Sequence, residues 1–293
     1  MSITLPKLFL DSSDPAETAK ARALLGHLDG QTTNPSLVAK NPTIQNLIQQ
    51  GKKLTEQDVY DCYKDLVQEI RSIISGPISV EVFSTWETKA ETMVQSAEKM
   101  QTWCNNVYIK FPTLPEGLKA AHTFVKNGGK VNMTLVFDQV QAAAVYSATM
   151  DATYTPFVSP FIGRWDDRGF NGLDVVQNIQ KMYHSFSKRK KRTKNVEVLG
   201  ASIRSMEHFY SCIFLGVDIV TVPLKIVEEW IENEHWMPDE RYRIHTNGLK
   251  PLPYQQIPFF EDFTKYEIPK IEGSLLDEGL NKFITEWEKL ISY

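Results

Sequence analysis

Lys110 lies within an apolar stretch, VYIKF (107–111), that has the composition of a buried β-strand. An unpaired charge is unfavourable in a protein core, so a buried lysine is expected to lose its proton or to contact an acid. The neutral amine is a nucleophile toward carbonyl carbon. Most lysines reach water, and the alternative interpretation is that the strand ends here and the ammonium group is solvated.

Polar side chains also stand at or near the ends of other strand-like stretches. These are Asp11, Asn34, Glu81, Asn132, Thr134, Ser159, Arg164, Ser202, Arg204 and Thr221. Most of them have an ordinary structural explanation. Asp11 can cap a helix, Asn34 before Pro35 can start a turn, and the two arginines can form ion pairs at the surface.

Glu81 is harder to explain structurally, because side chains alternate between the two faces of a strand. In residues 78–83 this alternation places Glu81 on the face opposite three aliphatic side chains. If the aliphatic face packs under helices, Glu81 points to the interior, where Lys110 on the next strand is a natural partner. The same alternation places Asn132 and Thr134 together on one face of their strand.

One amine, two carboxylates, two amides, several hydroxyls and two guanidinium groups match one type of chemistry. A lysine attacks a ketone to form an imine, and the protonated imine accepts the electrons of a neighbouring carbon–carbon bond as that bond breaks. Carboxylates transfer the protons that these steps require. Arginines bind a phosphate group through paired hydrogen bonds. These residue types therefore predict an imine-forming enzyme with a phosphorylated substrate.

The elements that must position these residues alternate between strand-like and helical patterns. The expected strands are residues 7–11, 30–34, 78–83, 107–111, 130–136, 155–161, 196–202 and 218–223. Helical patterns occupy residues 55–74, 86–103, 115–127, 138–150, 203–215 and 223–234, and another helix opens at Pro15 with Ser13 as its cap. Eight such units predict an α/β fold, a (β/α)8 TIM barrel with its active site at the C-terminal ends of the strands. A doubly wound open sheet is the alternative.

The pattern changes after the eighth unit. Residues 235–270 are rich in proline, aromatic and charged residues without a clear period, and we expect an ordered but irregular C-terminal extension there. A terminal amphipathic helix is expected near residues 275–291, with one apolar stripe that packs on the barrel or on a partner. We expect residues 1–293 to form one domain, with the barrel at about 7–234.

The bulk composition is that of a cytoplasmic enzyme. The chain has 293 residues, a net charge of −4 and 42% apolar residues, which does not call for a nucleic acid or a membrane as partner. Three widely separated cysteines, without a signal-like or membrane-spanning stretch in the sequence, favour a reducing compartment. The stretch KRKKRTK (188–194) leaves a non-catalytic nucleic-acid-binding protein as an alternative, although no aromatic residue interleaves its basic side chains.

Several segments, in order along the chain, are similar to signature segments of the transaldolase family. They are TTNPS (32–36), IKFPTLPEG (109–117), VNMTLVF (131–137), SPFIGR (159–164) and GASIR (200–204), and FLD (9–11) and SVEV (79–82) fit the same pattern. The resemblance covers roughly residues 7–230. It implies a class I aldolase barrel in which a lysine forms a Schiff base with the substrate.

The resemblance implies catalytic roles for four residues of this sequence. Lys110 matches the imine-forming lysine. Asp11 matches the acid that takes the proton from the C4 hydroxyl as the C3–C4 bond breaks. Glu81 matches an acid–base that acts through a water molecule, and Thr134 matches the threonine that holds this water.

Further residues match the family's substrate-binding positions. Asn34 and Asn132 match the amides that hold a dihydroxyacetone unit, and Ser159 matches a serine at the hydroxyl end of the substrate. The phosphate-binding positions are matched by Arg164, Arg204 and, as an assisting residue, Ser202. The loop after Arg164 departs from the family pattern and brings Asp166, Asp167 and Arg168 close to the expected phosphate site.

The resemblance favours transfer over simple cleavage. Smaller relatives that act as free fructose-6-phosphate aldolases tend to have Gln where Glu81 stands and Tyr where Phe161 stands. An apolar Phe161 is expected to keep the intermediate until an acceptor aldehyde arrives. A free aldolase on the same scaffold is the alternative.

The implied reaction belongs to the pentose phosphate pathway. A dihydroxyacetone unit would pass from fructose 6-phosphate to erythrose 4-phosphate, which gives sedoheptulose 7-phosphate and glyceraldehyde 3-phosphate. No metal or organic cofactor is expected, because the protonated imine takes the role of a Lewis acid. Long members of the family are often homodimers, so the resemblance implies self-association.

Overall fold

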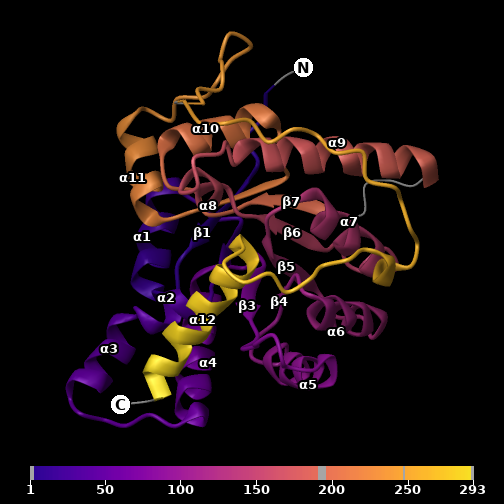
Figure 1. The fold of residues 1–293 in the computed structure, drawn as a ribbon. Coiled ribbons are helices and arrows are strands. Elements are labelled where there is room, and N and C mark those ends of the chain that lie inside the picture. Colours follow the sequence, from indigo (N-terminus) through magenta and orange to yellow (C-terminus); the bar gives the residue numbers. More distant parts are fainter. Residues whose placement is uncertain (1–2, 191–195, 247, 292–293) are drawn as a thin grey trace.

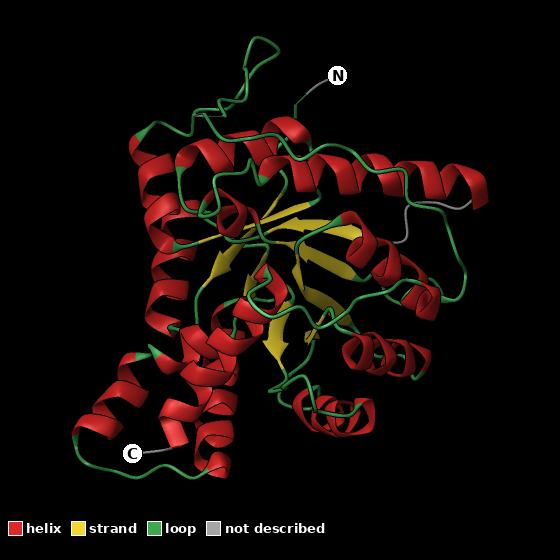
Figure 2. Ribbon diagram, viewed as in Figure 1, coloured by secondary structure: helices red, strands yellow, loops and turns green. Residues whose placement is uncertain are grey.

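Eight parallel β-strands close into a barrel that is surrounded by helices (Figures 1 and 2). The computed structural model describes residues 3–190, 196–246 and 248–291. The strands are β1 (Lys7–Asp11), β2 (Gly30–Thr32), β3 (Ile78–Glu81), β4 (Val107–Pro112), β5 (Val131–Val136), β6 (Phe157–Pro160), β7 (Glu197–Gly200) and β8 (Ile219–Val222). Because β8 pairs with β1, the predicted TIM barrel is confirmed and the open sheet is excluded.

The helices cover the outside of the barrel. They are α1 (Pro15–Leu25), α2 (Pro35–Ala39), α3 (Pro42–Gln49), α4 (Glu56–Ile73), α5 (Ala90–Met100), α6 (Pro115–Lys126), α7 (Gln139–Ala148), α8 (Ile162–Asp166), α9 (Leu173–Lys190), α10 (Met206–Leu215), α11 (Leu224–Glu232) and α12 (Leu275–Ile291). The expected helices are present, and α2, α3, α8 and α9 are additional. The long α9 has buried side chains at Val176, Ile179, Tyr183 and Phe186, which is helical spacing, so its signal was in the sequence.

Local signals explain where the helices begin. Helix α1 starts at Pro15, and the side chain of Asp14 accepts a hydrogen bond from the Ala16 amide at 2.9 Å. The expectation that Ser13 caps this helix is therefore wrong, because the capping side chain must come directly before the first helical residue. Helix α4 starts with a capping box, in which Thr55 and Asp58 each satisfy the other's backbone amide.

Strand alternation separates two apolar clusters. The outward side chains of the strands pack under the helices and form the large core. A second cluster lies inside the barrel and consists of Phe9, Tyr108, Phe157, Leu199, Ala201 and Ile219. Its members lie along the strands, except Ala201, which directly follows β7. Gly30 makes room for the Phe9 ring, because a Cβ atom there would lie 2.6 Å from it. This cluster closes the barrel interior below the next inward layer.

The next inward residue of most strands, two positions later, is polar. This layer contains Asp11, Thr32, Glu81, Lys110, Thr134, Ser159 and Thr221. It lies closer to the C-terminal ends of the strands, which is the end of a TIM barrel that carries active sites. The fold therefore gathers polar side chains from seven strands above an apolar plug.

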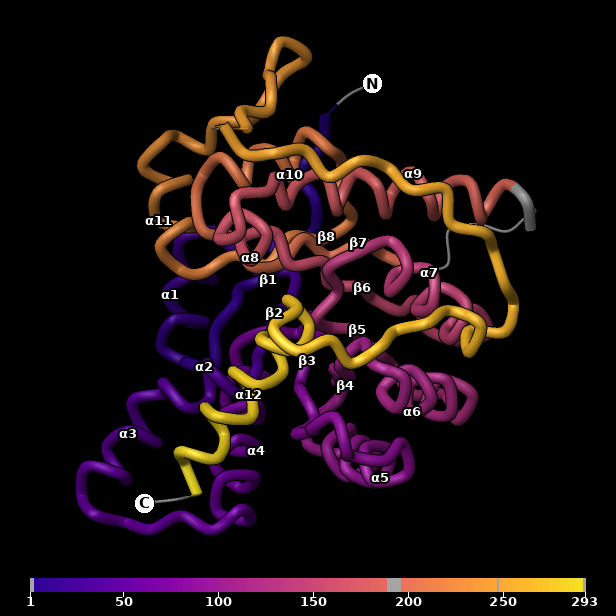
Figure 3. The backbone as a smooth tube through the Cα atoms, viewed as in Figure 1, coloured from indigo at the N-terminus to yellow at the C-terminus, as the bar shows by residue number. Residues whose placement is uncertain are grey.

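The C-terminal extension crosses the helices and returns to the barrel. Figure 3 shows it passing along α10 and α9 toward α7 before α12 begins. Backbone oxygens of Leu252 and Phe260 accept hydrogen bonds from Asn178 on α9 and Ser147 on α7. Among its described residues, one short 3-10 helix (Phe263–Lys265) is the regular element before α12, as the irregular composition predicts.

Helix α12 packs its apolar stripe against the barrel side of the molecule. Leu276, Leu280, Phe283, Trp287 and Leu290 are buried, and the helix contacts α2, α4 and β5.

We propose that the barrel and residues 235–293 form one domain, because this packing joins both ends of the chain. A single cooperative transition in thermal unfolding followed by circular dichroism is expected, and two separate transitions would contradict it. No helix among the described residues has the length and apolarity to cross a membrane.

Candidate active site

Lys110 is almost completely buried. Its side chain is 5% exposed, and Nζ lies 2.8 Å from Oε2 of Glu81, whose side chain is 4% exposed. The register of β3 and β4 places these two residues directly opposite each other, which is the contact that strand alternation predicts. Nζ also donates to the backbone oxygen of Thr33 at 2.9 Å. The solvated interpretation of Lys110 is thus excluded by its burial.

Two carboxylates flank the lysine, and burial acts on both. Burial raises the pKa of Glu81, an effect that the positive charge of Lys110 opposes. Burial likewise raises the pKa of Asp11, against the opposing effects of Lys110 and of the hydrogen bond that Thr32 donates at 2.7 Å. Both acids therefore hold a proton to higher pH than an exposed carboxyl group does.

A row of amide and hydroxyl groups lines the strands on the other side of Lys110. Asn132 pairs with Lys110 in the register of β4 and β5. Its amide donates to Ser79 Oγ at 3.1 Å and accepts from Ser159 Oγ at 2.7 Å, so its orientation is set from both sides. Thr134 Oγ1 is buried and has no hydrogen-bond partner within the described residues. A buried hydroxyl in this state is a candidate contact for a water molecule or a substrate.

Asn34 and Ser36 come from the short helix that follows β2. Asn34 caps α2, because its Oδ1 accepts from the Leu37 amide at 2.9 Å. Asn34 thus has a structural role, but as the cap of a helix and not as the start of a turn. Its side-chain NH₂ group, which does not take part in the cap, can donate to a ligand. Ser36 Oγ is buried without a hydrogen-bond partner among the described residues, as Thr134 Oγ1 is.

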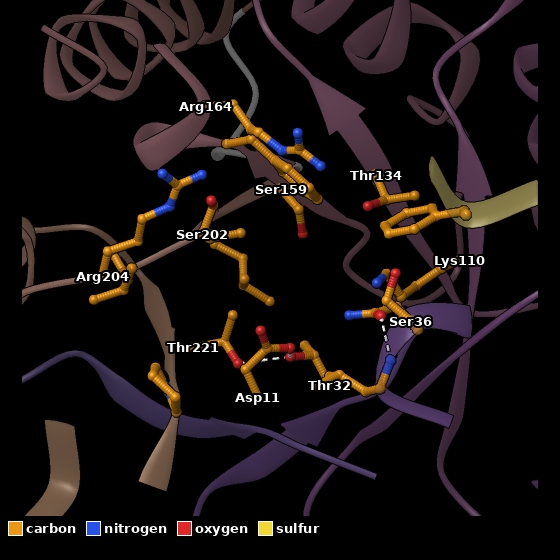
Figure 4. Close-up of a pocket in the computed structure, with 18 of the residues that line it drawn as sticks. Asp11, Thr32, Ser36, Lys110, Thr134, Ser159, Arg164, Ser202, Arg204 and Thr221 are labelled. Atoms are coloured by element: carbon orange, nitrogen blue, oxygen red, sulfur yellow. Dashed lines mark hydrogen bonds between the residues drawn. The ribbon is translucent and has the colours of Figure 1, made fainter. Parts of the chain in front are cut away.

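The two arginines follow β6 and β7. Arg164 lies in α8 and is half-buried, and Arg204 follows Ser202 beyond the end of β7. Ser202 has a left-handed backbone conformation with φ of 59°, which is uncommon for a residue other than glycine. Figure 4 shows the Arg204 side chain across the pocket from Lys110 and the Arg164 side chain at the upper edge of the pocket.

Arg204 is paired with an acid of the unusual loop. Its guanidinium binds both carboxylate oxygens of Asp167, with Nη2 and Oδ2 2.8 Å apart. The hydrogen bond from Arg204 holds the pKa of Asp167 below its usual range, so Asp167 is ionised at neutral pH. The neighbouring Asp166 lies 2.6 Å from His208 Nε2, and Nδ1 of that ring accepts from the Arg204 amide at 3.3 Å. The loop thus fixes the backbone at Arg204 and occupies its side chain.

These residues surround one cavity of about 340 Å³. Of the residues predicted from the sequence, those that line it are Asp11, Asn34, Lys110, Thr134, Ser159, Phe161, Arg164, Ser202 and Arg204. Glu81 and Asn132 do not line it; they stand behind and beside Lys110. Thr221, which the sequence places among the polar residues at strand ends without a predicted role, also lines the cavity. Further lining residues, among them Thr32, Ser36, Lys225, Lys282 and Phe283, lie outside the prediction.

Some of these additional residues carried a signal. Ser36 lies in the TTNPS segment, and Thr221 stands at the end of the eighth expected strand. Lys282 and Phe283 come from α12, whose docking position does not follow from its own sequence pattern. The pattern of α12 shows which face is buried but not where on the barrel it packs.

Comparison with known proteins agrees with this geometry. A model of the transaldolase/fructose-6-phosphate aldolase family matches residues 8–292. A probable transaldolase of Leptospira biflexa is 36% identical over 75% of this chain and 88% of its own length. Probable transaldolases of Caldicellulosiruptor saccharolyticus and Clostridium botulinum are 38% and 37% identical, over 76% and 75% of this chain and 88% and 87% of their own lengths.

The family match covers the barrel and the C-terminal extension alike. It confirms the prediction of an enzyme, a transferase of the transaldolase type. The segments that carried the resemblance all lie inside the matched range. The chain belongs to the transaldolase/fructose-6-phosphate aldolase family.

Proposed function

We propose that the chain transfers a dihydroxyacetone unit from fructose 6-phosphate or sedoheptulose 7-phosphate to an aldose phosphate, through an imine formed on Lys110. The observation that carries this proposal is the buried Lys110–Glu81 ion pair beside a cavity that Arg164 and Arg204 also line. An amine and guanidinium groups around one cavity suit a ketone that carries a phosphate. The family implies sugar phosphates as substrates.

Imine formation begins when Lys110 Nζ attacks the C2 carbonyl carbon of the ketose. The attacking amine must be neutral, and Glu81 Oε2, at 2.8 Å, can accept its proton. The raised pKa of Glu81, caused by burial, makes this carboxylate a stronger base than an exposed glutamate. The carbinolamine then loses water to give the protonated imine. The unpartnered Thr134 hydroxyl among the described residues supports a role in holding that water.

Carbon–carbon cleavage uses the acid on the opposite wall. The Asp11 carboxylate takes the proton of the C4 hydroxyl, the C3–C4 bond breaks, and its electrons move to the imine to give an enamine on Lys110. The aldose phosphate leaves as an aldehyde. In the second half, the enamine carbon attacks an acceptor aldehyde and Asp11 returns the proton to the new hydroxyl. Hydrolysis of the imine then frees Lys110 and the product.

Binding of the two substrate ends follows the polarity of the cavity. We propose that Asn34 and Ser159, which line the cavity, hold the hydroxyl groups of the dihydroxyacetone unit. Asn132 does not line the cavity and would act on the same unit through Ser159, whose hydroxyl donates to its amide oxygen. Arg164, Arg204 and Ser202 would bind the phosphate group. A phosphate that reaches Arg204 must then compete with Asp167.

This competition gives opposite predictions for the two partners. Arg204→Met should raise the KM for fructose 6-phosphate by about tenfold, because a charge-assisted hydrogen bond is lost. Asp167→Asn should lower that KM by about two- to fourfold, the effect of releasing an exposed ion pair. Steady-state kinetics of both variants test this. Arg241→Met, which breaks an exposed ion pair with Asp239 outside the cavity, is the matched control. Unchanged KM values in both variants would place the phosphate elsewhere.

Phe161 affects whether the enamine is protonated and released without an acceptor or persists until an acceptor aldehyde binds. Its ring lines the cavity and packs edge-on against Phe137, with centroids 5.6 Å apart. Phe161→Tyr adds a hydroxyl that can donate a proton or position water, so cleavage without an acceptor should rise by about tenfold or more. The rate of transfer to erythrose 4-phosphate serves as the internal control. An unchanged rate of acceptor-free cleavage would remove this role of Phe161.

The wider setting is also a proposal. We propose a place in the pentose phosphate pathway, a cytoplasmic location and a homodimer. The three cysteines Cys62, Cys104 and Cys212 are free, which agrees with a reducing compartment. Cell fractionation and light scattering test the last two statements. Residues 191–194 of the basic run behind the nucleic-acid alternative lie outside the described residues.

The experiment that tests the function is release of glyceraldehyde 3-phosphate from fructose 6-phosphate, measured with and without erythrose 4-phosphate. Release that requires the acceptor is the expected result. Equal release without the acceptor would mean a free aldolase on this scaffold. Folded protein that releases no product under either condition would refute the proposed substrate.

A further inference from the structure

Helix α12 brings a lysine to the mouth of the cavity. Lys282 lines the same cavity as Arg164 and Arg204, although it lies far from both in sequence. Asp11 is the one carboxylate that lines this cavity among the described residues. Arg164, Arg204 and Lys282 thus bring three positive charges to the cavity, and Asp167, which pairs with Arg204, offsets one of them. The remaining positive charge favours an anion there.

Lys282 is exposed and lies near an acid as well as near other cations. Its positive charge contributes to the lowered pKa of Asp167, the acid that is paired with Arg204. Within the described part of the chain, its Nζ makes no ion pair and no hydrogen bond. Partial burial, followed by the positive charges of Arg164, Lys40 and Arg204, lowers the pKa of Lys282, and Glu286 compensates only in part. A dianion that contacts the arginines would also lie in the field of this ammonium group.

The position of Lys282 is fixed by contacts on both sides of it. Toward the start of α12, Trp86 Nε1 donates to Asp277 at 2.9 Å and Arg168 lies 2.7 Å from Glu278. Further along, Trp287 is buried and stacks on Phe83, with ring centroids 5.6 Å apart. The helix is therefore held at two points, and Lys282 lies between them.

The helix also approaches the barrel unusually closely. A Cβ atom on Gly279 would lie 2.9 Å from the buried Leu135 side chain near the end of β5, so a larger residue would force that side chain to shift. Gly279 precedes Lys282 by three residues, which places both near the same side of the helix. The contact that seats the helix thus lies next to the lysine that faces the cavity.

We propose that Lys282 is a further substrate-binding residue, which completes with Arg164 and Arg204 a three-cation site for the phosphate group of the sugar. The inference rests on the proposed function, because that function supplies the phosphorylated substrate. A phosphate dianion would offset the mutual repulsion of the three side chains. The terminal helix then contributes directly to the preference for phosphorylated substrates.

The test uses Lys282→Met, with Lys289→Met as the control, because Lys289 is an exposed lysine of the same helix that does not line the cavity. Lys282→Met should raise the KM for fructose 6-phosphate and the dissociation constant of inorganic phosphate, measured by calorimetry, by about tenfold each. The kcat should stay within about twofold, because Lys282 binds the distant end of the substrate. Lys282→Arg should restore both constants, which a merely structural defect would not explain.

The outcomes separate this inference from the proposed function. If the wild-type protein catalyses transfer and Lys282→Met behaves as Lys289→Met does in both assays, the three-cation site is wrong and the function stands. If the wild-type protein shows no turnover while Lys282→Met still weakens phosphate binding, the anion site is supported and the function fails. A wild-type protein that binds no inorganic phosphate would overturn the three-cation site directly.

Discussion

Lys110→Met should abolish turnover, with a loss of roughly 10⁴-fold or more, the scale on which removal of a nucleophile acts. Methionine fills a similar volume but has no amine to form the imine. Borohydride reduction in the presence of fructose 6-phosphate should attach the substrate carbon unit to the wild-type protein. Peptide mapping by mass spectrometry should locate it at Lys110 and should find none in the variant.

The fold is expected to survive this substitution. Lys110 opposes the rise in the pKa of Glu81, so its removal raises that pKa further and favours the neutral acid. A neutral buried carboxyl group is much less unfavourable than an unpaired charge. Lys119→Met, at an exposed lysine of α6, is the control, and circular dichroism checks the fold. Persistent trapping on another lysine would contradict the assignment of Lys110.

Asp11→Asn should lower kcat by about 10²- to 10⁴-fold, because asparagine cannot accept the C4 hydroxyl proton. Imine formation precedes this step and depends on Glu81, so borohydride trapping with fructose 6-phosphate should persist. Rapid-quench measurement of glyceraldehyde 3-phosphate release in a single turnover tests this separation. Loss of trapping together with cleavage would mean that Asp11 acts before the bond-breaking step.

The raised pKa of Asp11 predicts where the acid limb of the pH profile of kcat/KM lies. Asp11 must be ionised to accept a proton, and burial raises its pKa, so the acid limb of kcat/KM should lie above that of an exposed aspartate. The hydrogen bond from Thr32 favours the charged form and lowers the pKa. Thr32→Val removes it, so the limb should move to higher pH. A limb that stays in place would show that another group controls it.

Much of the barrel could be predicted from the sequence because strands and helices leave different patterns of apolar residues, a two-residue alternation and a 3.6-residue repeat. Alternation along each strand determines which side chains face inward, and parallel pairing then brings residues such as Glu81 and Lys110 together. The eight-unit pattern did not separate a closed barrel from an open sheet. That distinction depends on the pairing of β1 with β8, a contact between residues about 210 positions apart.

Other parts of the candidate site depend on contacts that no local pattern encodes. Arg204 is paired with Asp167 because a loop after β6 meets the end of β7, and the sequence showed only that these acids lie near the expected site. Lys282 reaches the cavity because α12 docks through Gly279 and Trp86. An amphipathic stripe shows which face of a helix is buried. The surface on which that face packs is formed by residues distant in sequence, so the stripe does not give the docking position.

The position of α12 has a consequence for biosynthesis. A chain is made from its N-terminus, so every strand of the barrel has been synthesised before α12 emerges from the ribosome. Until then the apolar surface that Trp287 and Phe283 cover is open to solvent and to chaperones. Helix α12, which carries Lys282, is the last part of the cavity to be synthesised. We therefore expect the nascent protein to form the strands of the barrel before it can bind a phosphorylated sugar.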